Sequence, residues 1–120
     1  MTTQKQAFGQ WGEKTAAAYL ENNGYTILER NFHTAHGEID IVASKAAVLI
    51  FVEVKTRSSH AFAYPEDSVT QRKQAHMLSA AADYLQTHPL SGESWQFDVI
   101  AIERKPGGSP DIVHFENVIS

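Results

Sequence analysis

Two acidic residues and a lysine, Asp40, Glu53 and Lys55, lie in stretches of the sequence that are otherwise rich in Ile, Val and Phe. Residues 37–43 and 49–57 each read as a β-strand, and the short segment between them suits a hairpin turn. Ionised side chains in buried strands are costly unless they are paired, hydrogen-bonded or bound to a metal ion. Their presence in these strands therefore indicates a binding or catalytic site.

The alternation of side chains along a strand predicts how these groups are arranged. Side chains two residues apart share a face, so Glu53 and Lys55 point the same way. If the strands pair antiparallel around a turn at residues 44–47, Asp40 falls opposite a residue near position 51 and lies diagonally from Glu53. The two carboxylates could then share a cation, with the Lys55 ammonium alongside.

A hard divalent cation fits such a pair of carboxylates. Mg²⁺ is commonly held by one or two carboxylates, while waters and phosphate oxygens complete its octahedron. A lysine beside the ion can orient or activate a water and offset charge that develops on phosphorus. The alternative is a plain salt bridge of Glu53 with Lys55 or Arg57 on a half-exposed strand. A lone Glu-Val-Lys triplet favours the salt bridge, but Asp40 in a second apolar strand favours the metal site.

The order of these residues resembles a nuclease signature. Asp40, followed by Glu53-Val54-Lys55 on the next strand, is similar to the D…(D/E)-x-K motif of the PD-(D/E)xK superfamily, which includes restriction endonucleases and archaeal Holliday-junction resolvases. Five blocks in order also closely resemble the bacterial YraN family of small nuclease-like proteins; they cover residues 9–13, 37–40, 51–57, 69–74 and 97–99. This resemblance runs over nearly the whole chain, from about residue 8 to residue 114.

The resemblance implies a fold and a function. The fold is an α/β domain with one mixed sheet flanked by helices, of the restriction-endonuclease-like αβββαβ type. The function is metal-dependent cleavage of DNA, with branched or single-stranded DNA as the substrate class. Asp40 and Glu53 would bind Mg²⁺ or Mn²⁺ together with the Val54 carbonyl. Lys55 would position the attacking water, and Glu13 in the first helix would assist directly or through water.

Basic residues near these groups are candidates for contacts with DNA phosphates. Arg57 follows Lys55 on its strand, and Arg72 and Lys73 lie in the first turn of a predicted helix, where backbone N–H groups add to a phosphate site. A plain solvated first turn explains Arg72 and Lys73 equally well. The net charge of −4 argues against strong DNA binding, because phosphate affinity comes from Lys and Arg. The alternative function is therefore a nuclease-fold module that binds nucleic acid or a protein partner with little chemistry.

Length and composition are those of a small globular protein. A chain of 120 residues suffices for one core, and we expect residues 1–120 to form a single domain. The absence of cysteine excludes disulfides and thiolate metal sites. The sequence shows neither a membrane-spanning run nor a signal peptide, which predicts a cytoplasmic protein without membrane partners. One site of this kind cuts one strand, so a homodimer would suit cleavage of both.

Hydrophobic periodicity predicts the order helix, three strands, helix, two strands. The helices cover residues 4–23 and 71–87, and the strands cover residues 25–32, 37–43, 49–57, 95–102 and 111–118. The second helix is expected to turn one stripe of residues inward: Gln71, Gln74, Ala75, Leu78, Ala81, Ala82 and Leu85. A loop at residues 58–67 leaves the candidate site directly and is expected to face the substrate. Asp98 is expected to tether a backbone or basic group, and His114 to be a hydrogen-bonded strand residue.

Overall fold

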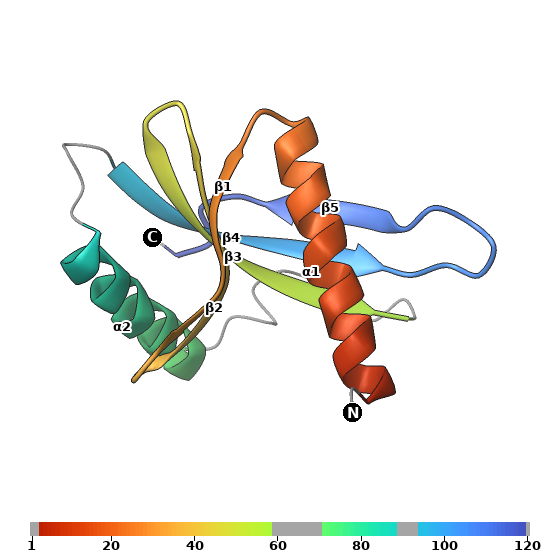
Figure 1. The fold of residues 1–120 in the computed structure, drawn as a ribbon, viewed down its shortest axis with the longest axis horizontal. Coiled ribbons are helices and arrows are strands. Elements are labelled where there is room, and N and C mark those ends of the chain that lie inside the picture. Colours follow the sequence, from red (N-terminus) through yellow and green to blue (C-terminus); the bar gives the residue numbers. More distant parts are fainter. Residues whose placement is uncertain (1–2, 59–70, 89–93, 120) are drawn as a thin grey trace.

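One mixed sheet with two helices makes up the computed structural model, which describes residues 3–58, 71–88 and 94–119 (Figure 1). The elements follow in the order α1 (Gln4–Asn22), β1 (Thr26–Thr34), β2 (Gly37–Lys45), β3 (Val48–Arg57), α2 (Gln71–Thr87), β4 (Ser94–Glu103) and β5 (Asp111–Phe115). The described strands lie in the order β1-β2-β3-β4-β5, and of the four pairs between them only β3–β4 is parallel. The predicted α/β class with a single mixed sheet is confirmed.

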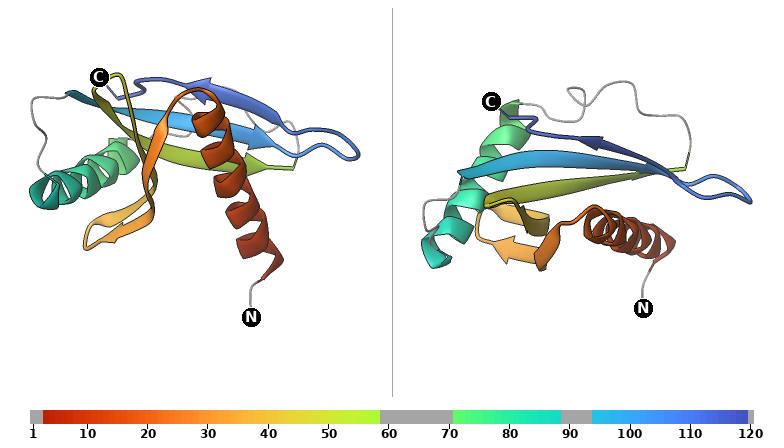
Figure 2. Two further views of the ribbon diagram at one scale, coloured as in Figure 1. Left: turned by 45° about the horizontal axis from the view of Figure 1, so that its top comes forward. Right: turned by 90° about the horizontal axis from the view of Figure 1, so that it is seen from above.

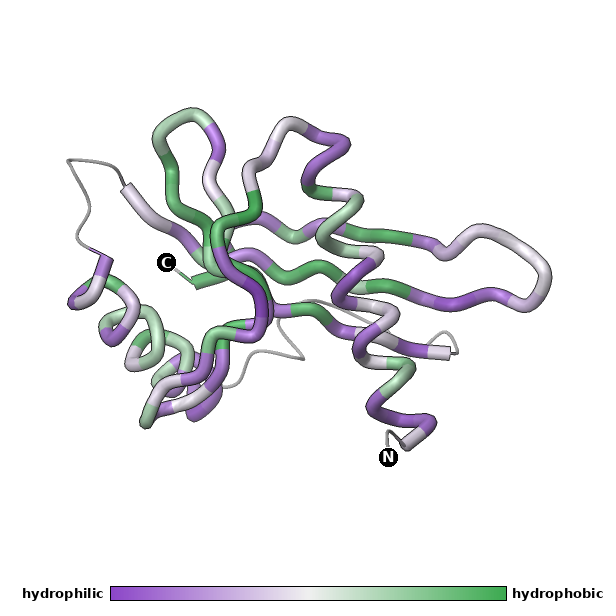
Figure 3. The backbone as a smooth tube through the Cα atoms, in the orientation of Figure 1, coloured by the Kyte–Doolittle hydropathy of each residue, from purple (hydrophilic) through white to green (hydrophobic). Residues whose placement is uncertain are grey.

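Alternating residues of the central strands build two cores on opposite faces of the sheet. Ile50 and Val52 of β3 pack with Ala16 and Leu20 of α1, whereas Phe51 packs on the other face with residues of α2. The two helices accordingly lie well apart in both views of Figure 2. Figure 3 shows hydrophobic residues concentrated along β3 and β4, as buried central strands require.

The helix α1 begins and ends with recognisable capping residues. Thr3 and Gln6 form a capping box, in which each side chain accepts a hydrogen bond from the other residue's backbone N–H. Asn23 caps the other end, and Gly24 follows with a φ of 87°, a left-handed conformation that glycine adopts without strain. The helix therefore ends at Asn22, one residue before the predicted end at residue 23.

The buried face of α2 differs from the predicted one. Leu78 is 40% exposed and Ala82 is exposed, whereas Tyr84 is buried. The Tyr84 ring packs edge-on against Phe32 at 5.1 Å and against Phe51 at 5.6 Å between centroids. Burying a large aromatic ring contributes more than burying alanine, so the aromatic contacts set the rotation of the helix. The inward placement of Ala81 and Leu85 agrees with the sequence pattern, because Ala81 is buried and Leu85 packs against the same core.

The β2–β3 register also corrects the prediction. These strands are joined by a two-residue turn, and Ile41 lies opposite Val52. Asp40 is therefore level with Glu53 and not diagonal to it. The last strand is shorter than expected, since β5 ends at Phe115.

Two further predictions concern the loop after β3 and the absence of a membrane-spanning segment. Most of the loop expected at residues 58–67 lies outside the described residues. Neither described helix is long and apolar enough to cross a membrane.

Candidate functional site

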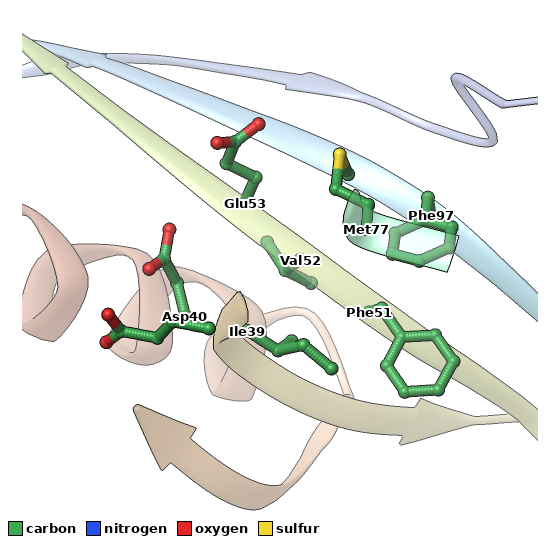
Figure 4. A pocket seen from close by; sticks show the side chains of 8 residues that line it. Ile39, Asp40, Phe51, Val52, Glu53, Met77 and Phe97 are labelled. Carbon is green, nitrogen blue, oxygen red and sulfur yellow. The ribbon is translucent and has the colours of Figure 1, made fainter. Parts of the chain in front are cut away.

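The candidate site lies where β2 separates from β3. These strands pair from Ile41 and Val52 towards their turn, and Asp40 is the first residue of β2 beyond the last pair. A pocket of about 50 Å³ opens here, with room for a small ion and a few waters. Figure 4 shows the carboxylates of Asp40 and Glu53 at one end of the pocket and apolar side chains at the other.

Glu53 is held by two lysines from different elements. Its Oε1 lies 3.5 Å from Nζ of Lys55 on the same strand and 2.5 Å from Nζ of Lys73 in the first turn of α2. Its Oε2 is buried and has no hydrogen-bond partner among the described residues. Leaving such an oxygen unsatisfied costs free energy, so this atom is a natural position for a ligand. Burial lowers the pKa of the Lys55 ammonium, the neighbouring Lys73 lowers it further, and Glu53 opposes both effects.

Asp40 is a largely buried carboxyl group with a raised pKa. Burial is the main cause that raises the pKa of Asp40 to about 7. The backbone N–H of Val54 opposes the rise by donating a hydrogen bond of 2.8 Å to Oδ2. The nearby carboxylates of Glu13, Glu53 and Glu38 add to it. Repulsion between neighbouring carboxylates is relieved when a cation lies between them.

Glu13 joins this acidic group from α1. Burial raises the pKa of Glu13 and the carboxylate of Glu38 adds to the rise, whereas a hydrogen bond with the Asn31 side chain and the charge of Arg30 oppose it. Asn31 has a φ of 53°, a left-handed conformation that asparagine adopts more readily than most residues. The strand β1 therefore contributes Arg30 and Asn31 beside the first-helix glutamate.

The donor set fits a hard divalent cation. The carboxylates of Glu38, Asp40 and Glu53 line one pocket, Glu13 is near enough to raise the pKa of Asp40, and the two lysine ammonium groups contact Glu53. These four carboxylates outnumber the two lysines when all are ionised. Within residues 3–58, 71–88 and 94–119, no three His, Asp or Glu side chains form a ready-made metal cage. An ion such as Mg²⁺ needs only one or two carboxylates when waters and substrate oxygens supply the rest. The bare Oε2 of Glu53 and the repulsion at Asp40 match that requirement.

The remaining residues predicted to contact the metal ion or DNA are Val54, Arg57 and Arg72. Val54 offers its N–H to Asp40, and its carbonyl stays a predicted ligand. Arg57 is exposed at the end of β3, where Nη1 donates to the carbonyl of the preceding residue at 2.9 Å. Arg72 is exposed in the first turn of α2. Thus Lys73 contacts the site through Glu53, whereas Arg57 and Arg72 are exposed at the surface.

Sequence patterns alone missed two contributions to the site. They indicate Lys73 as a phosphate contact, whereas the structure pairs it with Glu53. A usable signal was present, because a lysine in the first turn of a helix opposes the helix dipole and so points to a compensating carboxylate. The second is Asn31, whose polar side chain interrupts a predicted strand and hydrogen-bonds Glu13.

A close contact between α1 and β3 sets the depth at which Glu13 enters the site. Gly12 is buried, and a Cβ atom placed on it would lie 2.2 Å from Oγ1 and 2.9 Å from Cγ2 of Thr56. Any side chain at residue 12 would therefore force the Thr56 side chain or the helix to shift. Gly9 lies in the same helix, but no atom of the described residues comes within 4 Å of a Cβ placed there.

This contact predicts opposite effects for two glycine substitutions. Gly12→Ala is expected to lower the free energy of unfolding by about 1–2 kcal/mol, because overpacking outweighs the gain in helix propensity. The matched control Gly9→Ala gains propensity without a clash and is expected to raise it by about 0.5–1 kcal/mol. Urea denaturation measures both changes, and equal effects at the two positions would contradict the close contact.

A separate buried network surrounds Asp98 in β4. Its carboxylate is fully buried and accepts hydrogen bonds from His114 Nε2 at 2.6 Å, Gln96 Nε2 at 2.9 Å and the N–H of Asn117 at 2.9 Å. His114 Nδ1 in turn lies 3.3 Å from the hydroxyl of Tyr19 on α1. The predicted tethering role of Asp98 and the hydrogen-bonded role of His114 are confirmed. This network lies outside the pocket around Asp40 and Glu53.

Comparison of the amino-acid sequence with known proteins assigns this chain to a family. Residues 12–102 match the model of the "Uncharacterised protein family UPF0102". A UPF0102 protein of Syntrophomonas wolfei is 48% identical over 101 residues, which cover 84% of this chain and 88% of the relative. Another, from Syntrophotalea carbinolica, is 45% identical over 115 residues, which cover 96% of this chain and 93% of the relative. The chain therefore belongs to the UPF0102 family, the YraN family that its five sequence blocks resemble.

Proposed function

We propose that this protein is a Mg²⁺- or Mn²⁺-dependent endonuclease that hydrolyses phosphodiester bonds of DNA, with branched or single-stranded DNA as its substrate class. One observation carries the proposal: Glu53 Oε2 is buried without a partner among the described residues, beside Asp40 and Lys55. The order of Asp40 and Glu53-Val54-Lys55 adds support, because it resembles the PD-(D/E)xK nucleases. The sequence of elements is also that expected for a restriction-endonuclease-like core.

Each residue of the site has a role in the proposed reaction. Asp40 and Glu53 would hold the ion, and Glu13 would contact it directly or through a water. When bound, a divalent ion supplies Lewis-acid polarisation of the phosphate and eases deprotonation of water. Lys55 would hold the attacking water with its ammonium group and offset the negative charge that grows on the phosphate oxygens. The N–H of Val54 keeps the Asp40 carboxylate in place.

Basic residues around the pocket would position the DNA strand. Arg57 and Arg72 are exposed at the end of β3 and in the first turn of α2, and a guanidinium group can bind phosphate in bidentate fashion. Lys73 already pairs with Glu53, so its charge partly offsets that of the carboxylates before the ion and the substrate arrive. These contacts favour weak binding to DNA overall, in keeping with the net charge of −4.

The alternative is a module that binds nucleic acid or a protein partner without turnover. The acidic net charge and the lysine pair on Glu53 Oε1 favour it, because both reduce the positive charge available for a phosphate. Such a module would keep its affinity for DNA in Mg²⁺ or Mn²⁺ and leave the strand intact.

Cleavage of labelled DNA separates the two functions. Duplex, single-stranded and four-way-junction DNA are incubated with the protein in Mg²⁺ or Mn²⁺, beside a Glu53→Gln variant with the same shape but one fewer charge. The endonuclease proposal expects cutting by the unmodified protein, a loss of at least about 100-fold in the variant, and a preference for branched or single-stranded DNA. Binding without any cutting by a well-folded protein would refute the endonuclease and support the module.

A further inference from the structure

A second group of side chains with the chemistry of nucleic-acid recognition lies between α1, the helix that carries Glu13, and the end of β4. The rings of Phe8 and Trp11 stack with centroids 5.7 Å apart and planes only 7° from parallel. The guanidinium of Arg104, the residue that follows β4, lies over the Phe8 ring at 4.4 Å from its centroid. These three residues, which we call the aromatic–arginine cluster, come from opposite ends of the chain.

The aromatic–arginine cluster shares helix α1 with Glu13 and is joined to strand β3, which carries Lys55, by a backbone hydrogen bond. The N–H of Arg104 donates to the carbonyl of Arg57 at 2.9 Å, and Arg57 lies two residues beyond Lys55 on β3. On the helix, Trp11 precedes Gly12, which contacts Thr56, and is two residues from Glu13. At a rise of 1.5 Å per residue, Phe8 lies about 7.5 Å along α1 from Glu13. The cluster lies with α1 on the face of the sheet opposite to Glu53 and Lys55, so a DNA strand that leaves the pocket would reach it past the end of β3.

The geometry of the cluster suits a phosphate and a base at the same time. The guanidinium carbon of Arg104 lies over the Phe8 ring, and an arginine in contact with a ring can still bind phosphate through its N–H groups. Trp11 packs partly against the core, which holds its ring in place. A ring fixed in this way loses little conformational entropy when a base stacks on it.

Charge on this part of the surface is complementary to DNA in spite of the acidic chain. Lys5 is exposed one turn before Phe8 in α1, and Arg57 and Arg104 are exposed at the ends of the adjoining strands. Glu103 in the same region is buried in the sheet. The carboxylates of the candidate site face the pocket, so a strand can meet basic groups here before its phosphate reaches the acidic group.

We propose that the aromatic–arginine cluster binds an unpaired nucleotide of single-stranded DNA, on the part of the strand that extends beyond the candidate site. The choice of DNA rests on the proposed function. The choice of a single strand follows from the aromatic rings, because bases in a duplex are already stacked on each other and expose no face to a protein ring. This site would give the proposed enzyme a preference for single-stranded or branched DNA.

Tryptophan fluorescence tests the proposal without any cleavage. The chain has two tryptophans, so Trp95→Phe leaves Trp11 as the single reporter. The Trp95→Phe protein is titrated with a thymidine oligonucleotide in a metal-free buffer with EDTA. We expect saturable quenching of Trp11, and we expect blunt-ended duplex DNA of equal length to quench at least about fivefold less, since stacking needs an unpaired base.

Two variants and a control identify the residues involved. Arg104→Ala and Phe8→Ala, each made in the Trp95→Phe protein, are expected to weaken oligonucleotide binding about tenfold or more. Lys105→Ala removes the same charge one residue along the chain, but Lys105 is paired with Asp111 at 2.6 Å, so a change of less than about twofold is expected. Circular dichroism checks that each variant folds.

The outcomes separate this proposal from the endonuclease itself. Saturable quenching that depends on Arg104 and Phe8 supports the nucleotide site even if no DNA is cut. If the protein cuts DNA while Trp11 fluorescence stays unchanged at saturating oligonucleotide, or if Arg104→Ala binds as well as Lys105→Ala, the site is refuted and the endonuclease stands.

Discussion

Replacing Lys55 by alanine is expected to lower the rate of metal-dependent DNA cleavage by about 10²–10⁴-fold, with little effect on folding or metal binding. The Lys55 ammonium lies 3.5 Å from Glu53 Oε1, at the rim of the group that would hold the ion. Its removal takes away the group proposed to hold the attacking water, yet leaves both carboxylates in place. Metal affinity should be kept or slightly improved, because a competing cation is lost.

Three measurements on the Lys55→Ala variant distinguish catalysis from structure. Single-turnover cleavage gives the rate, calorimetric titration with Mn²⁺ gives the affinity for metal, and thermal unfolding gives the stability. Lys45→Ala serves as a control, since Lys45 is exposed at the opposite end of β2 and donates to the Asn23 carbonyl. Full activity of Lys55→Ala, or its failure to fold, would refute the assigned role.

Asp40→Asn is expected to stabilise the metal-free protein at pH 8 by about 2 kcal/mol, whereas Asp98→Asn is expected to destabilise it by about 3 kcal/mol. Both residues are aspartates with little exposure in the same sheet, so the two substitutions are matched in shape. Their opposite signs follow from their surroundings. Burial and nearby carboxylates disfavour the ionised form of Asp40, which accepts one hydrogen bond from the Val54 N–H. Asp98 instead accepts hydrogen bonds from His114, Gln96 and Asn117.

The pH dependence of the Asp40 effect follows from its raised pKa. The folded protein binds the proton of Asp40 with a pKa of about 7, well above the ordinary value of 3.8, so folding is favoured when Asp40 is protonated. That stabilisation is fully present below about pH 4 and is lost as the pH rises to about 7. Asparagine avoids the loss, so the advantage of Asp40→Asn should grow from pH 4 to pH 7 and then level off.

Denaturation in urea with EDTA, at pH 4.5 and at pH 8, measures these changes. A destabilising effect of Asp40→Asn at pH 8 would show that its charge is already compensated in the metal-free protein, and the case for a cation at this site would weaken. Stabilisation by Asp98→Asn would contradict the buried network, because an amide cannot replace a carboxylate that accepts three hydrogen bonds.

The acidic core of the candidate site could be predicted from the sequence because it depends on local rules. Alternation along a strand places Glu53 and Lys55 on one face, and a short turn brings Asp40 next to them. The exact register could not be predicted, since one residue more or less in the turn moves every partner. The actual turn contains two residues, Ala46 and Ala47, both with positive φ, a geometry that alanine does not signal.

The contributions of α2 depend on tertiary packing and were not predictable from local patterns. The rotation of the helix follows Tyr84, whose ring fits between Phe32 and Phe51 on other elements. That same rotation brings Lys73 to Glu53. A hydrophobic stripe that includes Leu78 and Ala82 scores well by periodicity, but it takes no account of which rings the sheet can accommodate.

The single parallel pair in the sheet has a consequence for the order of folding. Helix α1 and strands β1, β2 and β3 are neighbours in sequence, so their contacts close short loops and form early. Pairing of β3 with β4 brings Val48 to Ser94 and requires the whole crossover through α2, which costs more chain entropy. We therefore expect the carboxylates of the site to assemble first and Lys73 to arrive late. Until Lys73 arrives, the repulsion between the carboxylates is only partly offset. Divalent cations in the refolding buffer should therefore speed the assembly of α1 with β1, β2 and β3.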